Sequence, residues 1–213
     1  MVQCHHAIGE AGAGVRTVNS IFIYKLRTDN GGAPAVYRSR LSLAICKPRI
    51  RATAEVGDWI IGIAGKTLHP DSGLLYIAQV DEVLENGEYY RDGRFMRRPD
   101  AVYEWKGSRL KLRADPRFHG PENAGSDIGG APDYTQARVL LSSKFRYYGR
   151  AASTWYAAVS PLAHQMGQAR GIGHKVELTD TEHKAWMKVI RTAFRSPQIR
   201  TRPTELSSEV CRH

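Results

Sequence analysis

The apolar residues of this chain fall into short runs separated by turn-forming residues, a pattern typical of β-strands. In residues 20–25 isoleucines alternate with aromatic residues, so Ile21 and Ile23 are expected on one face of a strand and Phe22 and Tyr24 on the other. Further runs predict strands at residues 41–45, 59–63, 74–83 and 139–142. We expect these strands to form the body of the fold.

Helix signals lie in the last third of the chain. Ser160 followed by proline offers an N-cap and a first helical residue, and Gly171 offers a stop. Thr179 and Glu182 have the spacing of a capping box, and Trp186 then belongs to an apolar stripe at helical spacing. The pattern predicts two helices, of which the second packs its Trp186 face on the sheet.

The segment between the predicted strands at residues 74–83 and 139–142 is long and irregular. Residues 89–134 are rich in Arg, Gly, Pro and Asp, and their interleaved aromatics argue against full disorder, so the segment is expected to be a lid or a spacer. The order of strands, basic insertion, strand and helices predicts an α+β fold with one domain over residues 20–196. Residues 1–19 are expected to be a disordered leader and residues 197–213 a flexible basic tail.

The charge balance suggests the class of partner. Lys and Arg total 31 against 21 acidic residues, a formal net charge of +10. Such an excess favours nucleic acid, nucleotides or an anionic surface as partner, although it says nothing about the fold. The alternative is a basic protein that binds none of these.

The cysteines and the absence of long apolar runs indicate the compartment. Cys4, Cys46 and Cys211 are odd in number, far apart and outside any CxxC pair, which excludes a disulfide framework and a zinc ribbon. Residues 1–18 lack the apolar core of a signal peptide, and no run approaches the ~20 apolar residues of a membrane helix. We expect a cytoplasmic protein with no membrane contact, no metal site and no cofactor.

Basic residues gather after the apolar run at residues 41–45. Lys47, Arg49 and Arg51 alternate, so in an extended segment they would point to one side and could bind backbone phosphates. Arg150 is a weaker candidate for the same role. The alternative is a solvated edge strand, where Lys and Arg guard against aggregation.

Aromatic residues provide candidates for base stacking. Residues 142–149 combine hydroxyls, cations and aromatics beside a strand end, as in proteins that stack single-stranded or flipped bases. Tyr147, Tyr148 and Trp59 are the candidate walls of such a base site. Alternatively, all three belong to an aromatic core.

Four residues are candidates for catalysis, although no nucleotide-binding, zinc-deaminase or hydrolase motif is present. They are Cys46, Asp58, Asp29 and His119. A thiolate of Cys46 stabilised by the neighbouring lysine could be a nucleophile, but cysteine is also among the most buried residue types. An aspartate in the position of Asp58 more often bonds the amides of its turn.

Several segments together resemble one known family. They are Ile23-Tyr-Lys25 with the Asp-Asn-Gly-Gly-Ala-Pro loop, Leu43-Ala-Ile-Cys-Lys-Pro48, Gly57-Asp-Trp-Ile-Ile-Gly62 and Val139-Leu-Leu-Ser-Ser-Lys-Phe-Arg-Tyr-Tyr-Gly149. Spread over residues 20–190, they resemble the second subtype of the nucleotide modification associated domains of bacteria and their phages. The Gly-Asp turn is also similar to that of PUA-like and EVE barrels, which hold modified bases.

The resemblance implies a role in a DNA base-modification system. It predicts a small PUA-like β-barrel with a long basic insertion and C-terminal helices. The leading hypothesis is a module that recognises a modified or flipped base in a barrel pocket, with DNA or a modified nucleotide as ligand and other components of the system as partners. The alternative is an enzyme that modifies or demodifies a nucleobase or nucleotide.

Overall fold

The computed structural model describes residues 19–154, 156, 161–168 and 174–197. The predicted leader and tail therefore lie, except for Asn19 and Pro197, outside the described residues. The α+β class is confirmed, because strands and helices both contribute to the fold. The strands are β1 (Ile21–Leu26), β2 (Ala35–Tyr37), β3 (Arg40–Leu43), β4 (Trp59–Ala64), β5 (Leu74–Gln79), β6 (Glu82–Leu84), β7 (Tyr103–Lys106), β8 (Arg109–Leu112), β9 (Val139–Ser142), β10 (Lys144–Tyr147) and β11 (His174–Lys175).

The helices are short except for the last one. They are α1 (Pro48–Thr53), α2 (Ala124–Asp127), α3 (Pro161–Gln168) and α4 (Asp180–Arg195), with single 3₁₀ turns η1 (Glu88–Tyr90), η2 (Pro121–Asn123) and η3 (Gly149–Ala151). The predicted capping box of α4 is confirmed, since Thr179 accepts from the Glu182 amide and the Glu182 carboxylate accepts from the Thr179 amide.

The described strands form three sheets. A central sheet has the order β10-β5-β4-β1-β11, a second sheet has the order β2-β3-β9-β6, and β7 pairs with β8 in a hairpin. In the central sheet β1 and β4 are parallel and the other neighbours are antiparallel. No closed barrel occurs among the described residues, so the predicted PUA-like barrel is not confirmed.

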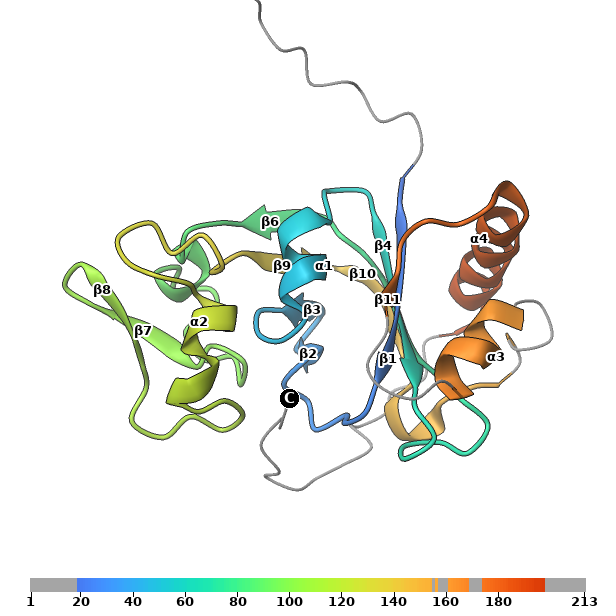
Figure 1. The fold of residues 1–213 in the computed structure, drawn as a ribbon, viewed down its shortest axis with the longest axis horizontal. Helices are drawn as coiled ribbons and strands as arrows, with labels where there is room; N and C mark the ends of the chain where they lie inside the picture. The colour runs from blue at the N-terminus through green and yellow to red at the C-terminus, as the bar shows by residue number, and fades with distance from the viewer. Residues whose placement is uncertain (1–18, 155, 157–160, 169–173, 198–213) are drawn as a thin grey trace, which may run out of the picture.

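The two faces of the central sheet belong to different cores, as the alternation in β1 predicts. Ile21 and Ile23 pack with Trp186 of α4, which is fully buried. Phe22 and Tyr24 pack on the other face with residues of the second sheet and of α1. Figure 1 shows α3 and α4 on one side of the central sheet and α1 and the second sheet on the other.

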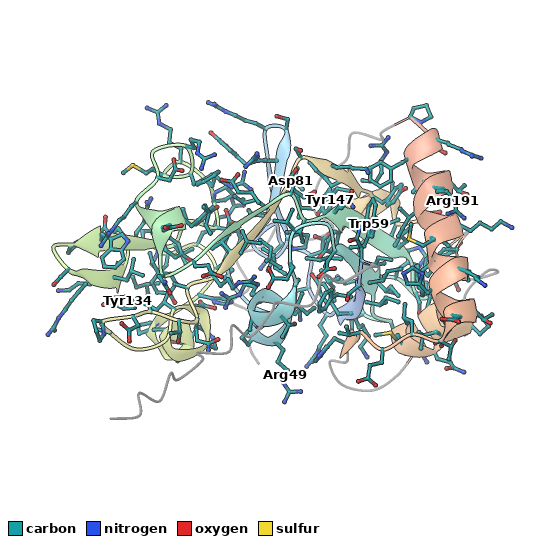
Figure 2. All side chains as sticks on the ribbon, turned by 90° about the horizontal axis from the view of Figure 1, so that it is seen from above. Arg49, Trp59, Asp81, Tyr134, Tyr147 and Arg191 are labelled. Atoms are coloured by element: carbon teal, nitrogen blue, oxygen red, sulfur yellow. The ribbon has the colours of Figure 1, made fainter. Side chains whose placement is uncertain are left out.

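The predicted single strand at residues 74–83 is wrong, because the chain leaves one sheet and enters the other at Asp81. Strand β5 ends in the central sheet and β6 begins in the second. The Asp81 carboxylate accepts a hydrogen bond from the amide of Ser143, where the chain crosses back between β9 and β10. A hydrogen bond therefore joins the crossover between β5 and β6 to the crossover between β9 and β10, and Asp81 lies at this junction (Figure 2).

The insertion at residues 89–134 packs a core of its own. Tyr89, Tyr90, Phe95 and Tyr103 are buried there with residues from the end of β3 and from β9. The insertion is thus attached to the second sheet, and it also carries two residues of the site described next.

Candidate active site

Cys46 lies in an unusual backbone turn between β3 and α1. Its φ is 59° and that of Lys47 is 46°, a left-handed region that non-glycine residues seldom adopt. Pro48 then begins α1, so residues 47–51 are not the extended segment in which the three cations would point to one side: two left-handed residues end the strand direction, and proline starts a helix. Rare backbone conformations of this kind cluster at functional sites.

The turn places the Cys46 sulfur against His119. The sulfur lies 3.0 Å from His119 Nε2, and His119 Nδ1 lies 2.5 Å from Asp127 Oδ2. The three side chains are nearly excluded from solvent, with residue exposures of 4% for Cys46, 1% for His119 and 0% for Asp127. They form a hydrogen-bonded cysteine–histidine–aspartate chain, which we call the triad.

The geometry of Asp127 fixes the role of the imidazole. Since the carboxylate accepts a hydrogen bond from Nδ1–H, Nε2 is the nitrogen that can accept a proton from the thiol. Asp127 is itself held, because Oδ2 accepts from the Tyr103 hydroxyl at 2.9 Å and Oδ1 accepts from the Cys46 amide at 3.3 Å. A nucleophile, a base and a group that orients the base are therefore in hydrogen-bond reach of one another.

Arg51 connects the turn that carries Cys46 to the helix that ends at Asp127. Its guanidinium donates to the carbonyl oxygens of Cys46 and Asp127, at 2.7 and 3.1 Å. It also donates to the carbonyls of Ser126, Gln136 and Arg138. Burial lowers the pKa of Arg51 and the nearby Asp127 opposes that shift. The predicted phosphate ligand is thus a buried residue that joins α1 to the insertion.

The other predicted phosphate ligands lie at the surface. Arg49 is exposed on α1 and points away from the protein in Figure 2. Lys47 is half-buried with its ammonium group 5.0 Å from the centre of the Tyr24 ring, and Arg150 is exposed in η3. Lys47 and Arg49 accordingly lie just after Cys46 in the chain, whereas Arg150 belongs to another part of the chain.

The predicted stacking residues are buried on two different faces of the central sheet. Trp59 and Tyr148 belong to the core beneath α4, where the Trp59 ring contacts Phe194 edge-to-face at 5.6 Å. Tyr147 belongs to the opposite core and donates to Asp29 Oδ1 at 2.6 Å. The described structure does not bring the three rings together.

The remaining catalytic candidates differ in their surroundings. Asp58 accepts from the amides of Ser20 and Glu55, which is the turn-bonding alternative. Asp29 is buried. The pKa of Tyr24 is raised mainly by burial and by Tyr76, and the charges of Cys46 and Asp29 raise it further by smaller amounts. Cys46 and His119 are therefore in direct contact, Asp29 is near the same tyrosine, and Asp58 is occupied elsewhere.

Asp127 was missed in the sequence because nothing local marks it. It ends α2, eight positions after His119 and far along the chain from Cys46. The insertion's aromatics did indicate a packed segment, but contacts between the insertion and the turn after β3 are long-range. In the part of the chain that the structure describes, no group of His, Cys, Asp and Glu is arranged to hold a metal ion.

Comparison with known families decides the wider context. A family model described as nucleotide modification associated domain 2 matches residues 18–209. The chain belongs to this family. The family name links the nucleotide modification domain to systems that modify nucleotides. No curated protein and no solved structure matched. Within the described residues, none of the helices has the length and apolar content needed to cross a membrane.

Proposed function

We propose that this nucleotide modification associated domain is an enzyme that acts on a nucleobase or nucleotide through a covalent intermediate on Cys46. The observation that carries the proposal is the triad, in which sulfur, imidazole and carboxylate are joined by hydrogen bonds of 3.0 and 2.5 Å. Hydrogen-bonded chains of this composition activate nucleophiles on several unrelated folds. The family name, which refers to nucleotide modification, supports a nucleobase or nucleotide as the substrate.

Each member of the triad has a defined task. His119 accepts the thiol proton at Nε2, and the resulting thiolate attacks an electrophilic carbon of the substrate. Asp127 holds the imidazole in the required tautomer and stabilises the imidazolium. The imidazolium then donates its proton to the leaving group, which restores the neutral base.

The basic residues beside the turn support a phosphate-bearing substrate. Lys47 and Arg49 follow Cys46 directly in the chain, so a phosphate bound by them would bring a nucleotide to the segment that carries the nucleophile. The net charge of +10 agrees with an anionic ligand. Binding of DNA or nucleotide through these two cations should weaken steeply with salt.

A reader without catalysis is less well supported. Its proposed base-stacking walls, Trp59, Tyr147 and Tyr148, lie in two separate cores and form no common site. Recognition of a modified or flipped base therefore enters the proposal as substrate binding near Cys46.

The first test is the reactivity of Cys46 in the native chain. With Cys4→Ser and Cys211→Ser, iodoacetamide labels one thiol, and its rate is followed over pH. A thiolate formed by proton transfer to His119 should alkylate nearly as fast at pH about 6 as at pH about 8, whereas an ordinary thiol, with a pKa of about 8.5, should slow strongly. The substitution Asp127→Asn should slow labelling at the lower pH by about tenfold.

Two results would contradict the proposal. A folded protein whose Cys46 resists labelling at every pH has a structural cysteine, and labelling unaffected by Asp127→Asn removes the triad as its cause. With a reactive thiol established, the protein is incubated with DNA carrying different modified bases and with unmodified DNA. A mass increase on Cys46 identifies the substrate.

A further inference from the structure

A row of tyrosines crosses the central sheet on the face that carries the site. Cα register pairs Tyr147 with Tyr76, Tyr76 with Gly62 and Gly62 with Tyr24. The Tyr76 ring lies over Gly62, where an added Cβ would come within 2.3 Å of Tyr76 Cε1. Because Gly62 of β4 has no side chain, the phenols of Tyr24 on β1 and Tyr76 on β5 meet across β4.

The hydroxyls of Tyr24 and Tyr76 have two O–H donors between them, and one of these donors is used in the hydrogen bond that joins them. Tyr24 and Tyr76 share a hydrogen bond of 2.7 Å between their hydroxyl oxygens. Each hydroxyl has one O–H to donate, and among the described residues this bond is the one hydrogen bond that either hydroxyl makes. One O–H of the pair therefore lacks an acceptor among the described residues, although both tyrosines are 0% exposed.

An unsatisfied buried donor is costly enough to need an explanation. Leaving such a group without an acceptor costs about 1–3 kcal/mol, and native structures contain few of them. The rings are edge-to-face at 6.0 Å, and both belong to the packed core between the sheets. The surplus O–H therefore needs an acceptor from outside the described residues.

This donor lies on the Cys46 side of the row. The ammonium group of Lys47, the residue after Cys46, is 5.0 Å from the centre of the Tyr24 ring. The pKa of Tyr24 is raised by burial, the largest cause, and also by Tyr76 and by the charge of Cys46. Burial also raises the pKa of Tyr76. Both phenols are therefore neutral near pH 7 and keep their protons available for donation.

We propose that the Tyr24–Tyr76 pair donates its free O–H to the carbonyl oxygen of the group that Cys46 attacks. This inference rests on the proposed function and narrows its substrate to a nucleobase or nucleotide that carries an acyl or amide carbonyl. Preorganised donors aimed at a developing oxyanion are among the largest contributions to acyl-transfer catalysis, and tyrosine hydroxyls can provide them.

The proposed step is an acyl transfer to sulfur. The thiolate forms a bond to the carbonyl carbon, and the π electrons move to the oxygen, which accepts the hydrogen bond from the tyrosine pair. Collapse of this intermediate breaks the bond to the amine or alcohol, which takes the proton held by His119, and leaves a thioester on Cys46. Water, deprotonated by His119, then hydrolyses the thioester and restores the thiol.

Two reagents separate this role from simple packing. p-Nitrophenyl acetate acylates sulfur through a carbonyl oxyanion, whereas methyl methanethiosulfonate transfers a methylthio group to sulfur with no carbonyl involved. Both rates are measured by intact mass on the chain with Cys4→Ser and Cys211→Ser. Because each single Phe variant leaves one phenol of the pair, the informative protein is the double variant Tyr24→Phe, Tyr76→Phe, with Tyr37→Phe as a control outside the row.

The double variant should acylate at least about tenfold more slowly, since one oxyanion donor is worth roughly 10²–10³ in rate. Its reaction with methyl methanethiosulfonate should stay within about twofold of the parent, since the triad is intact and exchange needs no oxyanion donor. Equal losses in both reactions, or no loss in acylation, would overturn the tyrosine role. A parent protein inert to both reagents would instead overturn the proposed function itself.

Discussion

Arg49 and Arg51 lie two positions apart on α1 and provide a matched pair at the scale of single residues. Arg51 is 1% exposed and donates to five carbonyl oxygens, whereas Arg49 is exposed. Replacing Arg51 by Met leaves these carbonyls buried without donors, so the free energy of unfolding should fall by about 3 kcal/mol or more. Arg49→Met should change it by less than about 0.5 kcal/mol. Urea unfolding of both variants measures the difference.

The same two arginines should separate folding from binding. Arg49→Met should weaken DNA binding and lower its salt dependence by about one counterion, because each phosphate contact contributes roughly one unit to the slope of log K against log salt. Binding isotherms at two salt concentrations measure this. An unchanged slope would show that Arg49 contacts no phosphate.

At the scale of elements, the packing of β4 against its neighbouring strands depends on Gly62, because a larger residue would collide with their side chains. A Cβ on Gly62 would lie 2.3 Å from Tyr76 Cε1 and 2.7 Å from Leu26 Cδ1. Gly62→Ala should therefore destabilise the fold by about 1–3 kcal/mol through overpacking. Gly93→Ala, where nothing lies within 4 Å, is the control and should have little effect. Equal midpoints in urea for the two variants would refute the close contact.

Elements that follow from local patterns could be predicted, and those that depend on partners could not. The alternation of β1 and the capping box of α4 are local, and both are confirmed. The break at Asp81 depends on a partner at Ser143, and the helix α1 depends on two left-handed residues before its proline. Alternating cations at residues 47–51 fit a strand as well as a helix, so the sequence pattern alone did not decide between the two elements.

At the scale of the whole molecule, the site exists because an insertion folds back on the sheet core. Cys46 comes from the turn between β3 and α1, and His119 and Asp127 come from the insertion at residues 89–134. Chemistry identified two of these three residues as candidates in the sequence. Their contact follows from packing over long distances in the chain, for which a single sequence gives no signal.

The tyrosines make the stability of the whole fold sensitive to alkali. Burial is the largest cause of a raised pKa at Tyr24, Tyr76, Tyr89, Tyr90, Tyr103, Tyr147, Tyr148 and Tyr156. Below pH about 10 these phenols are protonated in both the folded and the unfolded state, so stability is unaffected. Above that pH the unfolded chain ionises first, and each such tyrosine lowers the free energy of unfolding by about 1.4 kcal/mol per pH unit.

The protein should therefore unfold cooperatively a little above pH 10, and its buried tyrosines should ionise together as it does so. Tyrosinate absorbance and far-ultraviolet circular dichroism, recorded on the same samples, should change at the same midpoint. Tyr24→Phe removes one ionising group, so it should make the fall in stability with pH less steep by about 1.4 kcal/mol per pH unit. Stepwise ionisation of most tyrosines in a protein that keeps its circular dichroism would contradict the burial of these phenols.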